Sequence, residues 1–237
     1  MIFYIVAKIS ERLFLRLENN LGNEMIENVF SVAAFKYAES TLAEKCIFPG
    51  GALDKMLPIS FTIYLIKTDK HMILVDAGCD TMPGFEMKNF CGPVEALKRQ
   101  GIMPEDITDV IITHSHHDHI EAVCHFDKAT IYIQQHEYER AGGKYIPEGF
   151  RVQCFQESVD VAGCVKVIKV GGHSIGSCVV EFAIGEQKYV ITGDECYARE
   201  NLEKKIPTGS SYCFEKSLEF IEKYSQKEYT VLLCHEL

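Results

Sequence analysis

Short apolar runs recur along the chain and are separated by polar turns. Residues 61–66 and 72–75 are two such runs, rich in β-branched and aromatic side chains, and each predicts a strand. Residues 109–113 contain three consecutive apolar residues at 110–112, which is typical of a short strand buried on both faces. The same pattern predicts further strands at residues 130–133, 165–170, 179–184, 189–192 and 230–233.

Two segments have helical features instead. Residues 93–100 begin with a proline and are followed by Gly101, the usual start and stop residues of a helix. Residues 212–224 carry Phe214, Leu218 and Ile221 at helical spacing. Strands alternating with helices predict an α/β fold, and no internal repeat divides it. We therefore expect one domain over residues 25–237, with residues 1–24 as an N-terminal extension or a misassigned start before Met25.

Composition narrows the class of protein. The 237 residues carry a formal net charge of −10, and such an acidic chain disfavours a nucleic-acid partner. No apolar stretch approaches the ~18 residues of a membrane span, and the first residues do not resemble a signal peptide. The ten cysteines have no C-x-x-C spacing, and several lie in apolar runs, which favours free thiols in a reducing compartment. We expect a cytoplasmic protein without a membrane partner.

The segment 113–119 concentrates the candidate chemistry. It places four of the nine histidines and one aspartate directly after a buried strand. Packing so many imidazoles without a cation would bury polar groups with few partners, whereas imidazole and carboxylate are common zinc ligands. A solvated histidine-rich loop is the alternative interpretation. Further candidate ligands, each weak alone, follow other predicted strands: His173, Asp194 and His235.

The spacing H-x-H-x-D-H, here His114, His116, Asp118 and His119, resembles the signature of the metallo-β-lactamase superfamily. Gly172-His173-Ser174, Thr192-Gly193-Asp194 and Cys234-His235 follow in that family's order. The resemblance covers roughly residues 30–237. It implies a four-layer αβ/βα sandwich, in which two mixed sheets are flanked by helices and metal ions lie at one edge between the sheets.

The resemblance also implies a ligand set for two divalent ions. His114, His116 and His173 would hold the first ion, Asp118, His119 and His235 the second, and Asp194 would bridge them. Zinc is the expected ion, with manganese, iron and cobalt as alternatives. Such a pair can lower the pKa of a shared water from 15.7 towards about 7 and polarise a carbonyl group.

Asp194 also indicates a branch of the superfamily, because zinc β-lactamases characteristically have a cysteine ligand there. Asp194-Glu195-Cys196-Tyr197 resembles the Asp-x-x-Tyr segment of N-acyl homoserine lactonases. The resemblance implies that Tyr197 stabilises a developing oxyanion and that Asp118 passes a proton to the leaving alkoxide. A structural tyrosine is the alternative for Tyr197, and Cys196 is expected only to pack.

The expected substrate is therefore a small lactone or related carboxylic ester. Two other functions remain open. One is thioester hydrolysis of the glyoxalase II kind, against which the lack of a basic C-terminal region counts. The other is metal binding without catalysis. The oligomeric state is left open.

Some positions depart from the lactonase pattern. Glu121 stands where a small, glycine-containing turn is usual, and it either contacts a metal ligand or is a solvated charge. His117 replaces an apolar residue, which makes an acyl-chain pocket less certain, and Ile175 replaces a proline. Asp76 is expected to support the metal ligands, with turn capping as its alternative. His71, His125 and His136 fit no ligand position.

Overall fold

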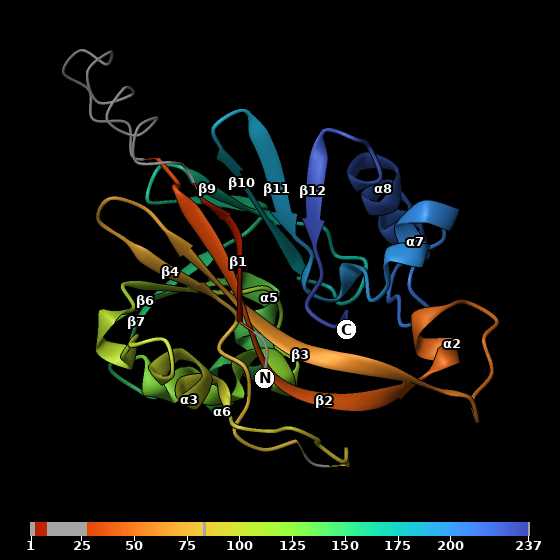
Figure 1. Cartoon of the computed structure of the whole chain (residues 1–237), viewed down its shortest axis with the longest axis horizontal. Helices are drawn as coiled ribbons and strands as arrows, with labels where there is room; N and C mark the ends of the chain where they lie inside the picture. Colours follow the sequence, from red (N-terminus) through yellow and green to blue (C-terminus); the bar gives the residue numbers. More distant parts are fainter. Residues whose placement is uncertain (1–2, 9–27, 83, 237) are drawn as a thin grey trace.

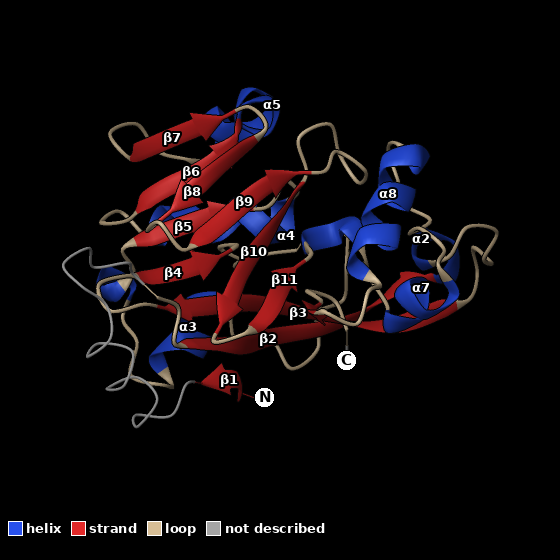
Figure 2. Cartoon of the chain, turned by 90° about the horizontal axis from the view of Figure 1, so that it is seen from above, coloured by secondary structure: helices blue, strands red, loops and turns tan. Residues whose placement is uncertain are grey.

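The computed structural model describes residues 3–8, 28–82 and 84–236 (Figure 1). Within these residues the strands form two sheets that face each other, and helices lie on their outer sides (Figure 1, Figure 2). This arrangement confirms the predicted α/β sandwich of two mixed sheets flanked by helices.

The first sheet has seven strands in the order β1-β2-β3-β4-β5-β6-β7. Its first four strands pair antiparallel, and β4 to β7 pair parallel. The strands are β1 Phe3–Lys8, β2 Ser31–Ala43, β3 Met56–Lys67, β4 Met72–Val75, β5 Asp109–Ile112, β6 Thr130–Gln134 and β7 Arg151–Phe155.

The second sheet has five strands in the order β12-β11-β10-β9-β8. All of its pairs are antiparallel except β11 with β12. The strands are β8 Ser158–Val161, β9 Val165–Lys169, β10 Cys178–Ile184, β11 Gln187–Ile191 and β12 Tyr229–Leu232.

Short helices and one longer helix connect these strands. Figure 1 places α3 and α6 outside the first sheet, and α7 and α8 beside the second. The helices are α2 Glu44–Ile47, α3 Pro93–Lys98, α4 His117–Ile120, α5 Gln135–Glu137, α6 Gly143–Tyr145, α7 Arg199–Lys204 and α8 Phe214–Tyr224.

The core forms three apolar layers, because alternate side chains of a strand point to opposite faces of its sheet. In β5, Val110 and Ile112 pack towards Leu97 of α3, whereas Ile111 packs between the two sheets. Phe220 of α8 belongs to the third layer, outside the second sheet. The central strands are therefore buried on both faces, and their ends bring polar residues into the interior.

Most predicted elements occur with shifted ends. The helix predicted at residues 93–100 ends at Lys98, and the one predicted at 212–224 begins at Phe214. The strand predicted at 230–233 is β12, Tyr229–Leu232. Strands β1, β2, β7 and β8 had no sequence prediction, although β2 has 13 residues.

The proposed N-terminal extension, residues 1–24, lies largely outside the described residues. Phe3–Lys8 forms β1 and pairs antiparallel with β2. The division into an extension and one domain over residues 25–237 stays a prediction.

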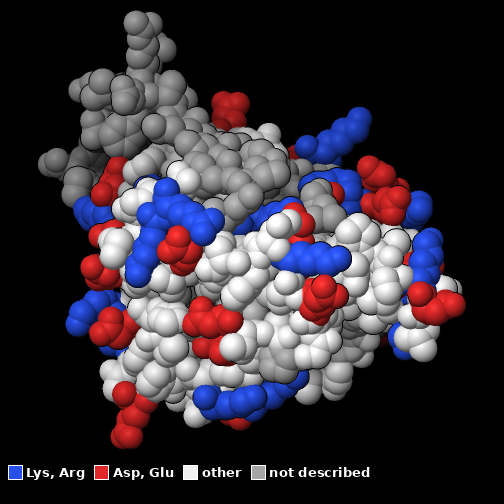
Figure 3. All heavy atoms as spheres, turned by 60° about the horizontal axis from the view of Figure 1, so that its bottom comes forward, with Lys and Arg blue, Asp and Glu red and all other residues white. Residues whose placement is uncertain are grey.

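Three further properties bear on the expectations drawn from composition. Among the described residues, no helix is long and apolar enough to cross a membrane. On the face drawn in Figure 3, acidic and basic side chains are interspersed rather than segregated. All ten cysteines lie in the described part of the chain, and none of them is in a disulfide.

Candidate metal centre

The candidate ligands meet because the strands that precede them end at one edge of the two sheets. Strand β5 is buried along its whole length, so the segment after it enters the space between the sheets. Its parallel neighbour β4 places Asp76 beside that segment. In the second sheet, β9, β11 and β12 run in the same direction and end before His173, Asp194 and His235.

Three histidines and one aspartate form the first group of donors. The Nδ1 atom of His116 lies 2.9 Å from Nε2 of His114 and 2.9 Å from Nε2 of His173. With a carboxylate oxygen of Asp194, these atoms all lie within 4.8 Å of one another. The group contains the three histidines that the sequence assigned to the first ion.

The second group combines the donor atoms of Asp118, His119 and His235, which also lie within 4.8 Å of one another. The Nε2 atoms of both histidines are 3.6 Å from Oδ2 of Asp118. The structure thus brings together all three residues that the sequence assigned to the second ion.

Asp194 faces both groups with different oxygens. Its Oδ1 lies 3.0 Å from Nε2 of His119 and 2.9 Å from Nε2 of His235. Its Oδ2 lies 3.5 Å from Nε2 of His173 and 3.7 Å from Nε2 of His114. One carboxylate therefore has an oxygen on each side, as a bridging ligand requires.

The outer nitrogens of two histidines show how these rings are oriented. His119 Nδ1 lies 2.7 Å from Oδ2 of Asp76, and His235 Nδ1 lies 2.8 Å from the carbonyl oxygen of Ser60. Both oxygens accept hydrogen bonds, so each Nδ1 carries a proton and each ring directs its Nε2 atom inward. Asp76 has the supporting role expected from the sequence, since it also accepts hydrogen bonds from the backbone N–H and the hydroxyl of Thr113.

These residues fit divalent cations. The Nε2 atoms of His119 and His235 lie about 3 Å from an oxygen of Asp194, so the site favours positive charge at this point, on the rings or on a bound cation. His119 Nε2 is buried and, despite its short distance to Asp194, lacks hydrogen-bond geometry to any described group. Imidazole nitrogens and carboxylate oxygens at such close spacing are the donor set of zinc and similar ions.

The electrostatics of the two groups differ. Burial lowers the pKa of His114 well below its usual value and lowers the pKa of His173 to about 4, so both rings stay neutral at neutral pH. Burial also opposes charge on His119 and His235, but the surrounding carboxylates, with Asp194 the strongest, together outweigh it and raise the pKa of both. The protein thus offers neutral imidazoles on one side and favours positive charge on the other.

Tyr197, the other predicted catalytic residue, lies at the same centre. It is 7% exposed, and its hydroxyl donates a hydrogen bond to Oδ2 of Asp194 over 2.6 Å. Its ring stacks on His235 with centroids 5.2 Å apart. Cys196 is fully buried and packs against the second sheet, as expected.

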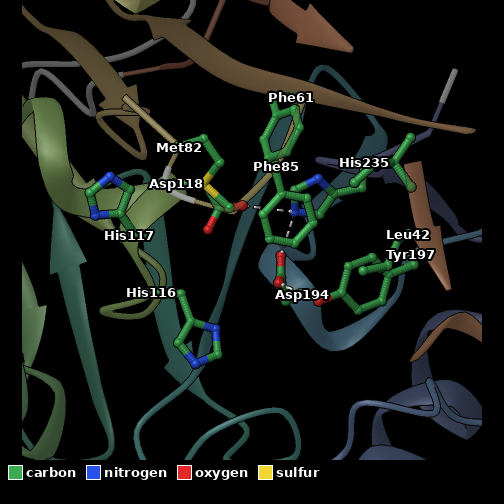
Figure 4. Close-up of a pocket in the computed structure, with 11 residues that line it drawn as sticks. Leu42, Phe61, Met82, Phe85, His116, His117, Asp118, Asp194, Tyr197 and His235 are labelled. Atoms are coloured by element: carbon green, nitrogen blue, oxygen red, sulfur yellow. Dashed lines mark hydrogen bonds and ion pairs between the residues drawn. The ribbon is translucent and has the colours of Figure 1, made fainter. Parts of the chain in front are cut away.

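A cavity of about 260 Å³ opens beside the two groups (Figure 4). Its polar side is formed by His116, Asp118, Asp194, Tyr197 and His235, with His117 at its border. Its apolar side is formed by Leu42, Ile59, Phe61, Met82 and Phe85. A small molecule with an apolar substituent can therefore reach the candidate ligands.

The remaining sequence candidates lie away from the donor atoms. Glu121 accepts a hydrogen bond from the backbone N–H of Asp80 over 2.6 Å, so it holds the neighbouring loop rather than a metal ligand. His71 pairs with the buried carboxylate of Asp109, and His125 pairs with the exposed carboxylate of Asp80. His136 is exposed, and Ile175 is 46% exposed.

Two buried glutamates near the centre, Glu137 and Glu195, were not among the residues predicted from the sequence. Glu137 contacts the loop of His116 and Glu195 contacts the loop of His173. The serines beside the metal-site histidines were the available indication, since buried hydroxyls need acceptors.

Comparisons with known proteins agree with this geometry. An N-acyl homoserine lactonase of a Bacillus species is 30% identical over 186 residues, which is 67% of this chain and 71% of that protein. A probable metallo-hydrolase of Methanocaldococcus jannaschii is 29% identical over 145 residues, covering 60% of this chain and 64% of that one.

Among solved structures, an N-acyl homoserine lactone hydrolase with N-hexanoyl-L-homoserine bound at its catalytic metal centre has the same fold. Its TM-score is 0.77 at 21% identity, over 90% of this chain and 95% of that chain. The family model of the metallo-β-lactamase superfamily matches residues 61–234. The chain therefore belongs to the metallo-β-lactamase superfamily.

Proposed function

We propose that the chain is a hydrolase that uses two divalent metal ions to open a lactone or a related carboxylic ester. The observation that carries this proposal is the position of Asp194, which directs one carboxylate oxygen towards each group of histidines. A bridging carboxylate of this kind offsets the charge of two dications held close together.

His114, His116 and His173 would hold one ion, and Asp118, His119 and His235 the other. Zinc is the ion that best suits these nitrogen and oxygen donors, with manganese, iron and cobalt as alternatives. When bound, the ions would supply an activated water and would polarise the substrate carbonyl.

Two residues of the chain have roles in the reaction itself. The Asp118 side chain lines the cavity beside the second group, where it can take a proton from the attacking water and deliver it to the leaving alkoxide oxygen. Tyr197 also lines the cavity, and its hydroxyl can donate to the carbonyl oxygen as negative charge develops there. In the structure this hydroxyl donates to Asp194, so the substrate must draw it away.

The lactone assignment draws support from the similarity to N-acyl homoserine lactonases and from the shape of the cavity. Figure 4 shows Phe61, Phe85 and Met82 around the carboxylates of Asp118 and Asp194. An ester group at the polar side would thus have apolar surface available for its acyl substituent. A small molecule is the proposed partner.

The test is an activity panel on purified protein reconstituted with zinc, manganese, iron or cobalt. N-acyl homoserine lactones, unsubstituted lactones and S-acyl glutathione thioesters are compared at equal concentration. We expect two bound ions per chain and the highest kcat/KM on a lactone. A higher kcat/KM on the thioester would make thioesters, not lactones, the substrate class. Two bound ions without turnover would make the chain a metal-binding protein.

Asp194→Ala and His116→Ala should remove activity and metal together. His136→Ala, which changes an exposed histidine away from the centre, is the matched control and should change neither. Full turnover by either site variant would mean that the centre is elsewhere.

A further inference from the structure

Two buried glutamates, Glu137 and Glu195, lie on either side of the loop that carries His173. They are 1% and 0% exposed, respectively. Neither has a cation partner among the salt bridges of the described residues, so each carboxylate depends on hydrogen bonds from the surrounding chain. A buried carboxylate without such partners would be costly, which makes its donors informative.

Glu137, at the end of α5, connects two loops. Its Oε2 accepts hydrogen bonds from the backbone N–H of Ser115 over 2.9 Å and from the hydroxyl of Ser115 over 2.5 Å. Its Oε1 accepts hydrogen bonds from the hydroxyl of Ser174 over 2.6 Å and from the backbone N–H of Gly176 over 3.0 Å. Ser115 lies between His114 and His116, and Ser174 follows His173. One carboxylate therefore ties together the backbones that carry the three histidines of the first group.

Glu195 approaches the same loop from the second sheet. Its Oε1 accepts hydrogen bonds from the backbone N–H groups of Gly172 and His173 over 3.1 and 3.2 Å, and from the hydroxyl of Ser177. Because Glu195 directly follows Asp194, this contact fixes the proposed bridging carboxylate relative to His173.

The loop sequence Gly172-His173-Ser174-Ile175-Gly176 is adapted to this close approach. A Cβ atom on Gly172 would come within 2.3 Å of Oε2 of Glu195. A Cβ atom on Gly176 would come within 2.3 Å of Oε1 of Gln134 and within 2.9 Å of Cγ of Glu137. All these distances are shorter than real contacts allow. The glycines let the backbone N–H groups reach the two carboxylates.

We propose that Glu137 and Glu195 are positioning residues that hold the segments of His114, His116, His173 and Asp194 in the geometry of the first metal ion. This inference rests on the proposed metal centre and adds two residues that do not line the cavity. The second group has different support, from Asp76 and the carbonyl oxygen of Ser60. The two ions should therefore respond differently when Glu137 is changed.

The test measures metal binding rather than turnover. Zinc is titrated into metal-free protein in competition with a chromophoric chelator, which resolves two dissociation constants. Glutamine keeps the size of the side chain but replaces one acceptor oxygen by a donor that faces N–H and O–H groups. We expect Glu137→Gln to weaken binding of the first ion by about 10–100-fold, which is the usual effect of losing a hydrogen-bond partner that supports a metal ligand. The second constant should stay within about threefold.

Glu181→Gln is the matched control, because Glu181 accepts hydrogen bonds from Tyr224 and Lys223 on the far side of the second sheet. It should leave both constants unchanged. Ser174→Ala removes one hydroxyl donor to Glu137 and provides a milder variant should Glu137→Gln not fold. Ser174→Ala should raise the dissociation constant of the same ion by a smaller factor.

The outcomes separate the two proposals. Wild-type protein that binds no zinc would overturn the proposed function. Wild-type protein that binds two ions, with Glu137→Gln or Ser174→Ala keeping both constants, would overturn the positioning role alone. An equal loss of affinity for both ions would also overturn the positioning role, because a general loss of stability has that effect.

Discussion

Asp76 and His119 form a buried pair in which Oδ2 of the carboxylate accepts the Nδ1 proton of the imidazole over 2.7 Å. Asp76 has a φ angle of 61°, a left-handed backbone conformation that is unusual for an aspartate. The same side chain holds Thr113 by two hydrogen bonds, so it fixes both the start of the histidine-rich segment and the direction of one ring. This pair determines which nitrogen of His119 faces the metal centre.

Asp76→Asn should therefore weaken metal binding without removing a ligand. An asparagine presents its amide group to the His119 ring and favours the wrong tautomer or a rotated ring. We expect a loss of about 10–100-fold in affinity for the second ion, measured by zinc competition titration. Asp109→Asn changes a comparable contact with His71 far from the centre, and it should leave both affinities unchanged. Unaltered affinity in Asp76→Asn would show that the orientation of His119 does not depend on this contact.

Removal of the metal should lower stability. Both sheets supply donors to each group, so a bound ion links them in the folded state only. A ligand present at a thousandfold its dissociation constant adds about 4 kcal/mol to the free energy of unfolding. Treatment with a chelator should lower Tm, and one equivalent of zinc should restore only part of the difference. Identical thermal unfolding of metal-free and metal-loaded protein would contradict this prediction.

Tyr197→Phe tests the hydroxyl at the centre. The change keeps the ring that stacks on His235 and removes only the donor. Loss of one such donor typically costs about 10²-fold in kcat, so we expect a fall of this order with two ions still bound. The control is Tyr64→Phe, since the buried hydroxyl of Tyr64 donates to the carbonyl oxygen of Leu233 instead. A kcat equal to that of the wild type would assign Tyr197 a purely structural role.

Phe85→Ala tests the apolar side of the cavity. Phe85 lines the cavity and is 38% exposed. Burying an aromatic side chain contributes about 1.5–3 kcal/mol, so loss of part of this contact should raise KM for hexanoyl homoserine lactone about tenfold. KM for an unsubstituted lactone should stay unchanged, because it lacks the acyl chain. Phe90→Ala, which alters an exposed phenylalanine outside the cavity lining, is the control. Equal effects on both substrates would place the acyl chain elsewhere.

The sequence was most informative where a strand ends in chemically distinctive residues. The apolar run of β5 followed by His114, His116 and His119 predicted both the strand and the donors, because imidazoles packed so closely without a cation would have few partners. His173, Asp194 and His235 were weak candidates individually. Their order along the chain and their place after strands made them candidates, and the structure brings them together.

Other features depend on contacts that no local pattern contains. Strand β2 includes Ala33, Ala34, Ala38 and Glu39, which favour a helix, but pairing with β3 along its length makes it a strand. Glu137 lies in the charged run Gln135-His136-Glu137-Tyr138-Glu139, which has the composition of a solvated helix. Only the approach of Ser115 and Ser174, 22 and 37 residues away, buries its carboxylate.

The distribution of donors between the sheets has a consequence for engineering. Residues 156 and 157 alone connect β7 in the first sheet to β8 in the second. A cut at this link would leave His114, His116, Asp118 and His119 on one fragment, and His173, Asp194 and His235 on the other. Neither fragment alone would have the donors for either ion, so reassembly of the two halves should require zinc, and the fold could then serve as a cation-gated split reporter.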